Sequence, residues 1–385
     1  QLKLAKDRAP KDPTPYFYDA INKQTTNRPV EALHDMQKAI ELNDNRGVYR
    51  SKLQIDKDES ARSAAQGRIY NTLGFNRPGL IEGWKSVNQD PSNFSAHRLL
   101  ADNYASQPLH ELARVSELLQ SQLLQPINTT AVQPQLAESN LIGLQSVGPS
   151  NLSFNEFNPI FTRNNFSLQA TGIVGNNDTY GDEVVHSGLW NNLSYSIGQL
   201  HSQTSGFRKN NDANIDLITG FFQANLLSNL SLQVEVRHKE LERGDYDLNA
   251  DGYSSDDFRI KTNRNTYRAG LHYNFEQGSD LIASFIHLDG TNYYEQPSFF
   301  SKSSDSIQGS QGEVQYLFSK DNFNLISGLG VAHSGFKGIN IFSENGVQKS
   351  DFRNPNYYHN NGYLYTYTHF PKNFDMTLGI SVDSF

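Results

Sequence analysis

One stretch of the chain combines residue types and spacing that suit a hard divalent cation. Asp247, Asn249 and Asp251 offer side-chain oxygens on alternate residues, and Gly252 follows them directly. Calcium takes several oxygen ligands, and a glycine at this point permits the sharp turn that wraps the backbone around the ion. The twelfth residue of such a loop is normally a bidentate Glu, but Phe258 stands there. Two interpretations follow: a calcium site, or a solvated acidic loop without a bound ion.

The loop over residues 245–257 is the only stretch for which the sequence suggests a cofactor. The 11 His residues include no H-E-x-x-H motif or paired metal spacing, and no Ser lies in a nucleophile elbow. Because the chain has no Cys, disulfide frameworks and thiolate chemistry are excluded. The net charge of -8 comes without a basic stripe, which argues against nucleic-acid binding. We therefore predict that the protein is not an enzyme and has no nucleic-acid partner.

The elements that carry these residues follow two periodicities, one helical before about residue 130 and one alternating after about residue 160. The chain has 385 residues, which is more than one average domain. Its mean hydropathy is -0.62 and it has no run of about 18 apolar residues, so a membrane-spanning helix is excluded. A membrane barrel is not excluded, because half of each strand would face the lumen and the hydropathy averages out.

Residues 1–126 are predicted to form helical repeats with a period of 34 residues. Small residues recur at two equivalent points of three successive windows, with an aromatic residue between them in two. They are Ala20, Gly67 and Ala101, then Ala32, Gly79 and Ala113, with Tyr70 and Tyr104 between. Paired helices that cross closely leave room only for Gly or Ala. The pattern resembles the tetratricopeptide repeat (TPR), whose stacked units bind peptides or partner proteins. An ordinary amphipathic bundle is the alternative.

Residues 127–163 are predicted to be a linker. Turn-forming residues such as Pro134 and Pro149 interrupt any sustained period there. The linker separates the repeats from residues 164–385, in which apolar and polar residues alternate. The fold class is therefore α + β and multidomain.

The alternation is clearest in three runs, at 230–237, 267–276 and 374–383. In the first, Leu230, Leu232, Val234 and Val236 share one face, while the residues between them are polar. Such a period of two predicts half-buried β-strands. Similar runs cover about 166–174, 184–190, 193–201, 214–226, 281–288, 311–318, 323–332 and 362–370. We therefore expect about eleven strands.

The links between these runs alternate in length. Short links are predicted at 191–192, 227–229, 277–279, 319–322 and 371–373, and long links near 175–183, 202–213, 242–263, 289–310 and 333–361. Tight turns on one side and long loops on the other are typical of antiparallel up-and-down transmembrane β-barrels in the bacterial outer membrane. A soluble β-sandwich is the alternative. If short links face the periplasm, the helical repeats lie there too.

Single-chain bacterial barrels have even strand numbers, so a count of eleven strands does not fit a closed barrel. We expect further strands after residue 385. The alternative is a twelfth strand at about 152–161, which would place the repeats outside the cell.

The inferred lumen face carries charges of both signs, which suits an aqueous or plugged pore. These residues are Glu235, Arg237, Arg268, His272, Glu276 and Glu313. Aromatic residues near strand ends predict girdles at the membrane interfaces. They are Trp190, Tyr195, Tyr273, Tyr316, Tyr363, Tyr365 and Tyr367.

The order of parts resembles the bacterial outer-membrane proteins that join periplasmic TPR repeats to a C-terminal barrel, among them exopolysaccharide-export porins. The resemblance implies an outer-membrane barrel for transport or secretion, surrounded by lipid. It also implies a periplasmic or surface protein partner bound by the repeats, and an exported polysaccharide as cargo. A second hypothesis is an outer-membrane anchor or assembly scaffold with a plugged lumen and protein-binding repeats and loops. Fold analogy alone does not decide between them.

Overall fold

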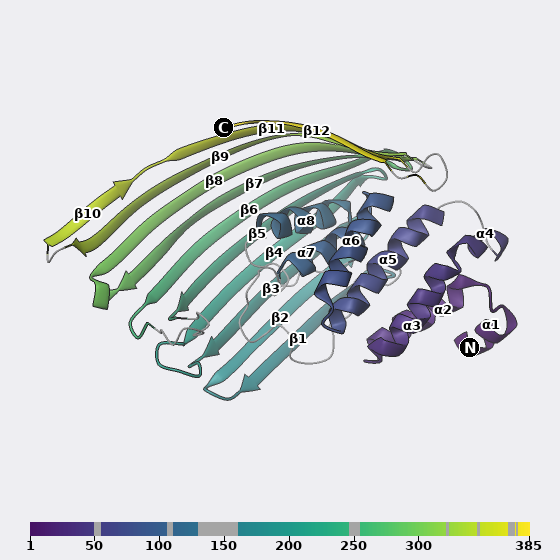
Figure 1. Ribbon diagram of the computed structural model, residues 1–385, viewed down its shortest axis with the longest axis horizontal. Coiled ribbons are helices and arrows are strands. Elements are labelled where there is room, and N and C mark those ends of the chain that lie inside the picture. The colour runs from purple at the N-terminus through teal and green to yellow at the C-terminus, as the bar shows by residue number, and fades with distance from the viewer. Residues whose placement is uncertain are drawn as a thin grey trace.

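The protein folds into a group of helices followed by one large, curved antiparallel sheet (Figure 1). The computed structural model describes residues 1–49, 55–105, 111–129, 161–245, 255–320, 323–344, 347–368, 374 and 376–385. The predicted combination of N-terminal helices and a C-terminal up-and-down sheet is therefore confirmed. The greater part of the predicted linker, residues 130–160, lies outside the described residues.

Most of the helices pack as hairpins of sequence neighbours, in the pairs α2–α3, α5–α6 and α7–α8. The bounds are α1 (Leu2–Arg8), α2 (Pro13–Thr25), α3 (Pro29–Glu41), α4 (Arg46–Tyr49), α5 (Ile55–Thr72), α6 (Asn76–Gln89), α7 (Phe94–Ala105) and α8 (Glu111–Leu124). Helix α2 begins with a capping Asp12, whose carboxylate accepts the Thr14 amide at 2.9 Å, and Pro13 stands first in the helix. None of the described helices is long and apolar enough to cross a membrane.

The small residues predicted to mark helix crossings lie where helices touch. A Cβ atom on Gly67 would stand 3.0 Å from the Gly79 carbonyl oxygen, and one on Gly79 would stand 3.0 Å from the Gly67 carbonyl. Ala20 and Ala32 are completely buried between α2 and α3. Ala113 is only half-buried, so the third window fits less closely. The packing argument holds for the first two hairpins, while membership of the TPR family remains a prediction.

Within the described residues, twelve strands form the sheet, and each pairs with its neighbours in antiparallel register. They are β1 (Asn165–Gly175), β2 (Thr179–Trp190), β3 (Leu193–Thr204), β4 (Ala213–Leu227), β5 (Leu230–Arg243), β6 (Arg259–Glu276), β7 (Ser279–Gln296), β8 (Ser301–Lys320), β9 (Phe323–Glu344), β10 (Val347–Arg353), β11 (Asn356–Thr368) and β12 (Met376–Ser384). The order is sequential except that β11 follows β9, while β10 pairs with β9 beside that path. The eleven predicted runs correspond to the strands of the main path, and β10 arises within a predicted long link.

Several strands run further than the alternation indicated. The predicted long link near 175–183 is a tight turn at 176–178, where Asn177 and Asp178 adopt positive φ angles of 57° and 51°. Likewise β7 and β8 pair over almost all of 289–310 and leave only the short helix η2 (Pro297–Phe299) and Phe300 between them. These two predictions of long loops are wrong, because the strands continue beyond the part in which one face is apolar.

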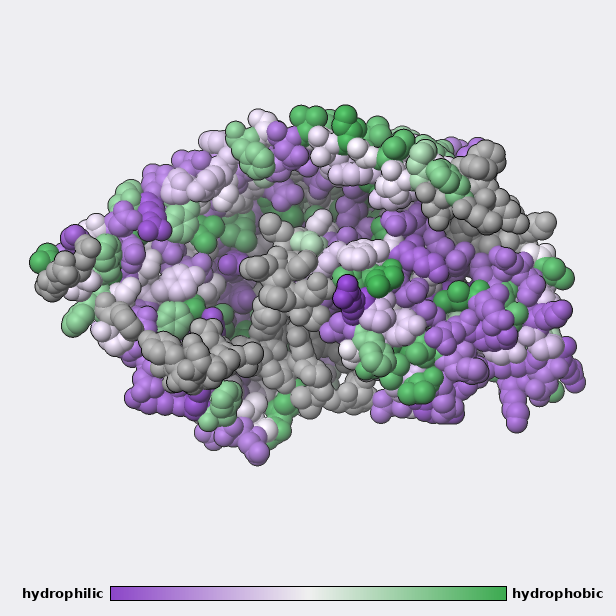
Figure 2. Space-filling view, in the orientation of Figure 1, coloured by the Kyte–Doolittle hydropathy of each residue, from purple (hydrophilic) through white to green (hydrophobic). Residues whose placement is uncertain are grey.

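The two faces of the sheet have inverted polarity compared with a soluble protein. On β5, Gln233, Glu235 and Arg237 are buried on the concave face, while Val234 and Val236 are exposed on the convex face. Exposed apolar residues continue over the convex face of the neighbouring strands: Ile218, Phe222, Tyr267, Phe285, Val314, Leu329 and Val331. Figure 2 shows apolar side chains gathered along the edge formed by β11 and β12, while the surface over α1–α3 is mostly hydrophilic.

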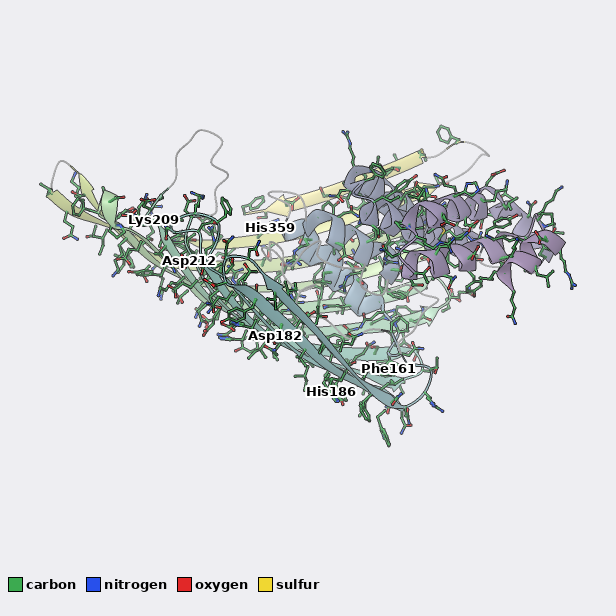
Figure 3. The ribbon with its side chains drawn as sticks, turned by 90° about the horizontal axis from the view of Figure 1, so that it is seen from below. Phe161, Asp182, His186, Lys209, Asp212 and His359 are labelled. Carbon is green, nitrogen blue, oxygen red and sulfur yellow. The ribbon has the colours of Figure 1, made fainter. Side chains whose placement is uncertain are left out.

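The last helices pack against the concave face of the sheet. Leu123 and Leu124 of α8 form a buried cluster with Ile282 of β7 and Leu317 of β8. These contacts lie near the short links of the sheet. Figure 3 places the helices at the end of the sheet near Phe161, away from Lys209 and Asp212 at the opposite end. The helical part is therefore joined to the concave face, which forms the inner wall of the sheet, at the short-link end.

Candidate functional site

A buried charge cluster occupies the concave face beside α8. The Glu235 carboxylate accepts a hydrogen bond from Arg237 Nε, and its second oxygen lies 3.4 Å from Arg268 Nη1. The three side chains are 3–6% exposed. Glu235 and Arg268 are direct cross-strand partners, so the register of β5 and β6 brings them together. One carboxylate thus compensates two guanidinium groups in a site shielded from water.

Helix α8 is tied to this cluster through Gln122. Its side-chain oxygen lies 3.4 Å from Arg268 Nη1, and its backbone carbonyl accepts a hydrogen bond from Gln233 Nε2. One turn further on, the Gln125 carbonyl accepts from Gln223 Nε2 at 3.1 Å. Since the last carbonyls of a helix have no partner within it, these strand amides cap the C-terminal end of α8. The helix end is therefore fixed by polar groups of the inner wall.

Two further features fit α8 and α6 to the sheet. Gly270 of β6 leaves space for Leu123, whose Cδ2 would stand 2.2 Å from a Cβ atom at that position. At the short-link end of β9, Asn324 Nδ2 donates to the carbonyls of Asn88 and Gln89 at 2.7 and 3.2 Å. Both contacts involve the concave face, so the helices are seated inside the curve of the sheet instead of extending freely from it.

The remaining predicted lumen residues have separate partners. His272 Nε2 lies 2.8 Å from Asp280 Oδ1, and Tyr363 Oη donates to Glu313 at 2.6 Å. Glu276 is exposed at a turn and contributes nothing to the inner wall. The prediction of a mixed-charge inner face is therefore confirmed for five of the six residues, but only Glu235, Arg237 and Arg268 form one cluster.

Three of the predicted girdle aromatics face the wrong way for that role. Tyr363 lies on the concave face, where its hydroxyl contacts both Glu313 and Gln315 Nε2, the latter at 2.8 Å. Tyr365 and Tyr367 share this face because strand residues two apart point to the same side. Gly328 on the intervening strand gives Tyr363 its space. Trp190, by contrast, is 68% exposed on the convex face, as predicted.

Sequence reasoning missed two cations on the inner wall, Lys239 and Arg264. They are direct cross-strand partners and both are half-buried. Both continue the phase that already placed Arg237 and Arg268 inward. The alternation of inward and outward positions could therefore have located them. The neighbouring residues that point outward are polar, however, so no apolar face marked a strand there.

The calcium prediction falls outside the described part of the chain, which ends at Asp245 and resumes at Ser255. Asp247, Asn249 and Asp251 are therefore not tested. The ends of this loop are held by protein contacts: Asp245 accepts the Ser255 amide at 2.8 Å and lies 3.2 Å from Arg208. Within the described residues, no group of three or more metal-ligating side chains is found.

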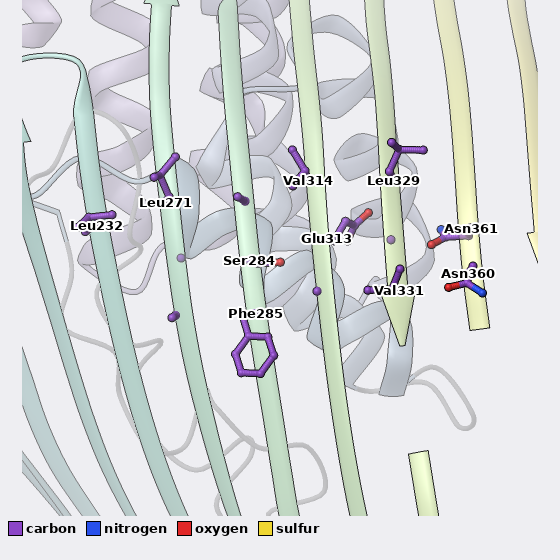
Figure 4. A pocket seen from close by; sticks show the side chains of 15 residues that line it. Leu232, Leu271, Ser284, Phe285, Glu313, Val314, Leu329, Val331, Asn360 and Asn361 are labelled. Atoms are coloured by element: carbon purple, nitrogen blue, oxygen red, sulfur yellow. The ribbon is translucent and has the colours of Figure 1, made fainter. Parts of the chain in front are cut away.

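The convex face carries an apolar depression of about 730 Å³ over β5–β11 (Figure 4). Small residues such as Ala269, Ala283 and Gly312 form its floor, between Leu271, Phe285 and Leu329. It lies on the opposite face of the sheet from the buried charges. The two faces of the sheet therefore differ in character: the convex face is apolar at the depression, and the concave face is polar at the charge cluster.

No family model matches the chain, and no curated protein matches its sequence. Among solved structures, the copper transporter OprC is similar with a TM-score of 0.49 and 8% identity, over 58% of this chain and 37% of that one. FpvA of P. aeruginosa bound to pyoverdines gives a TM-score of 0.47 and 12% identity, over 57% and 36%. The ferric yersiniabactin uptake receptor FyuA from Yersinia pestis gives 0.47 and 10%, over 57% and 38%. The chain spans little more than a third of each of these structures.

Proposed function

We propose that the protein is an outer-membrane β-barrel for transport, with its helical repeats seated in the periplasmic mouth. The observation that carries the proposal is the inverted polarity of the sheet. Val234 and Val236 are 51% and 47% exposed, while Glu235 between them is buried. Exposed apolar rows are stable where the surrounding medium is lipid, and the outward-facing band of a membrane barrel has this pattern.

The height of the apolar band suits an outer membrane. On β6 the outward apolar residues run from Tyr267 to Phe275, both exposed on the convex face. Eight residues of strand cover about 27 Å, and a strand tilt of about 40° reduces this to a band of roughly 20 Å. Barrels of this kind have a band of about 25 Å. In such a membrane, acyl chains would fill the depression between Leu271, Phe285 and Leu329.

The position of the helices agrees with a periplasmic mouth. Short links of outer-membrane barrels face the periplasm, and Asn324 beside one of them binds the carbonyls of Asn88 and Gln89 in α6. On this proposal α6–α8 partly fill the mouth, while the α2–α3 hairpin projects from it and is free to bind a periplasmic protein. The TPR-like packing of that hairpin supports such a partner.

A closed anchor or scaffold is the second candidate, and the seated α8 favours it specifically. Release of α8 would expose the apolar cluster of Leu123 and Leu124 and would break the hydrogen bonds that Gln223 and Gln233 donate to the end of the helix. On this candidate, α8 therefore stays in the mouth unless a trigger displaces it. The two candidates differ in whether the lumen conducts once α8 is released.

Membrane insertion can be tested with the two tryptophans of the chain. Trp190 lies on the convex face, whereas Trp84 lies on α6 and donates to Tyr104 Oη at 2.9 Å. In vesicles of brominated lipid, the Trp84→Phe variant should show strong quenching of Trp190. The Trp190→Phe variant, which reports Trp84 alone, should show little quenching. Absence of quenching at Trp190 in folded, vesicle-associated protein would refute the proposal.

A further inference from the structure

Helices α7 and α8 are seated against the sheet as one hairpin. Phe94, the first residue of α7, packs against the buried cluster that Leu123 and Leu124 of α8 form with the sheet. His97 lies one turn after Phe94 on the same side of α7, since residues three apart in a helix are neighbours. The seat of α8 in the sheet therefore includes a residue of α7, and it depends on the two helices staying together.

His97 joins the two helices of this hairpin. Its Nδ1 lies 2.5 Å from a carboxylate oxygen of Glu117 on α8, and its Nε2 lies 2.9 Å from the carbonyl oxygen of Pro91, shortly before α7. The side chain is only 8% exposed. Because both neighbours are hydrogen-bond acceptors, both ring nitrogens must donate, which only the imidazolium form can do. The contact between the helices is therefore complete only while His97 is protonated.

Loss of this proton would bring two acceptors into contact, whichever ring nitrogen keeps its hydrogen. A neutral imidazole has one donor, so either the Glu117 carboxylate or the Pro91 carbonyl would face a ring lone pair. A buried acceptor without a donor is costly, and the cost falls when water reaches it. Opening of the contact between α7 and α8 admits that water. The neutral form of His97 therefore favours a loosened hairpin.

The surroundings of His97 move this change above the usual pKa of about 6.5. Burial lowers the pKa of His97, but the Glu117 carboxylate, the Pro91 carbonyl and Asp90 raise it by more. Further charged groups lie on the elements packed against this part of α7 and on α7 itself: Arg68 of α5, Arg114 of α8, and Arg98 and Asp102 of α7. The carboxylates of Glu117 and Asp90 are the groups that favour the protonated form.

We propose that the α7–α8 hairpin is a proton-controlled closure, which fills the mouth while His97 is protonated and loosens when His97 loses its proton. The inference rests on the proposed function, which makes the concave face a lumen and α8 its occupant. The stability that His97 contributes is fully present below its unfolded pKa of about 6.5 and is lost as pH rises through the higher folded pKa. The trigger that displaces α8 is therefore a rise in pH.

Single-channel recordings of the full-length protein between pH 6 and pH 9 test this closure. The open probability of the wild type should rise about tenfold over this range, as for the loss of one hydrogen bond to a charged group. His97→Gln has no proton to lose, so its open probability should not change with pH. Glu117→Gln keeps the histidine but removes the charge that raises its pKa, so the rise should begin at a lower pH. A merely structural role of Glu117 would not move this midpoint.

The matched control is His272→Gln, which removes an imidazole that contacts Asp280 of the inner wall instead of a helix. It should keep the pH dependence of the wild type. The closure is refuted if His97→Gln also keeps that dependence, or if the conductance of the inserted wild type, high or low, is the same from pH 6 to pH 9. Trp190 quenching separates the two proposals. An inserted protein without a pH response refutes the closure and leaves the membrane barrel standing, whereas absence of quenching refutes the barrel and the closure together.

Discussion

At the scale of single residues, Glu235 is the only carboxylate among the inward positions of β5 and β6, and it contacts two arginines. Desolvated guanidinium groups are stable only when a counter-charge and hydrogen bonds compensate them. Arg268, one of these two arginines, also contacts Gln122 of α8. One side chain therefore links the charge balance of the wall to the position of the helix.

The first prediction concerns removal of that charge. Glu235→Gln should destabilise the protein by about 3–5 kcal/mol, because it removes the buried carboxylate that both Arg237 and Arg268 contact. Denaturant titration in detergent measures the loss. Glu240→Gln on the exposed face of the same strand is the control and should stay within about 0.5 kcal/mol. Equal effects of the two variants would show that the buried cluster is not a stabilising element.

His97 offers a second residue whose charge matters. Its Nδ1 lies 2.5 Å from a Glu117 oxygen and its Nε2 lies 2.9 Å from the Pro91 carbonyl oxygen. Two acceptors require that both ring nitrogens carry protons, which is the imidazolium form. Burial lowers the pKa of His97, but the Glu117 carboxylate and these hydrogen bonds raise it by more, so that the pKa lies above the usual 6.5.

A raised pKa makes the stability of the helices depend on pH. The contribution of His97 should be fully present below the unfolded pKa of about 6.5, and it should be lost as pH rises through the higher folded pKa. Unfolding of the helical part, followed by far-UV circular dichroism between pH 5.5 and 8.5, should therefore show falling stability. His97→Gln should flatten this profile, and His34→Gln at an exposed position should not. An unchanged profile in His97→Gln would contradict the assignment.

At the scale of elements, the sequence predicted the strands well wherever one face is apolar. Leu230, Leu232, Val234 and Val236 located the outward face of β5 correctly, and the eleven runs match the main path of the sheet. Beyond the apolar band this periodic signal is absent. There His238, Glu240 and Glu242 point outward, and alternation of polar with polar residues leaves no periodic signal. Hence β7 and β8 were predicted too short, and β10 was missed.

The apolar band gives a prediction about individual strand positions. If Val234 faces acyl chains, Val234→Arg should lower the free energy of unfolding in lipid vesicles by about 2–4 kcal/mol. His238→Arg lies four residues further toward the long links on the same face, and it should lower that free energy by only about 0–1 kcal/mol. Urea titration of the vesicle-inserted protein measures both. In a soluble sheet an exposed valine tolerates this change, so equal and small costs for the two variants would argue against lipid contact.

At the scale of the whole molecule, the seating of the helices within the sheet was beyond sequence reasoning. Gln122 and Gln125 look like ordinary polar residues on a helix surface, and Gln223 and Gln233 look like residues lining an aqueous lumen. Only the fold brings these four together. Their contacts are long-range and neutral, so neither composition nor spacing marks them. The polarity of the inner wall was predictable from the sequence, whereas the packing of α8 against it was not.

We propose that α8 sits in the mouth of a membrane barrel and limits passage through it. Single-channel conductance of the full-length protein in planar bilayers measures this passage. Leu123→Glu should displace α8, because it places a charge in the buried cluster with Ile282 and Leu317. Ser116→Glu, at an exposed position of the same helix, is the control. We expect low conductance for the wild type and the control, and a large, steady increase for Leu123→Glu. Equal conductance in all three inserted proteins would contradict it.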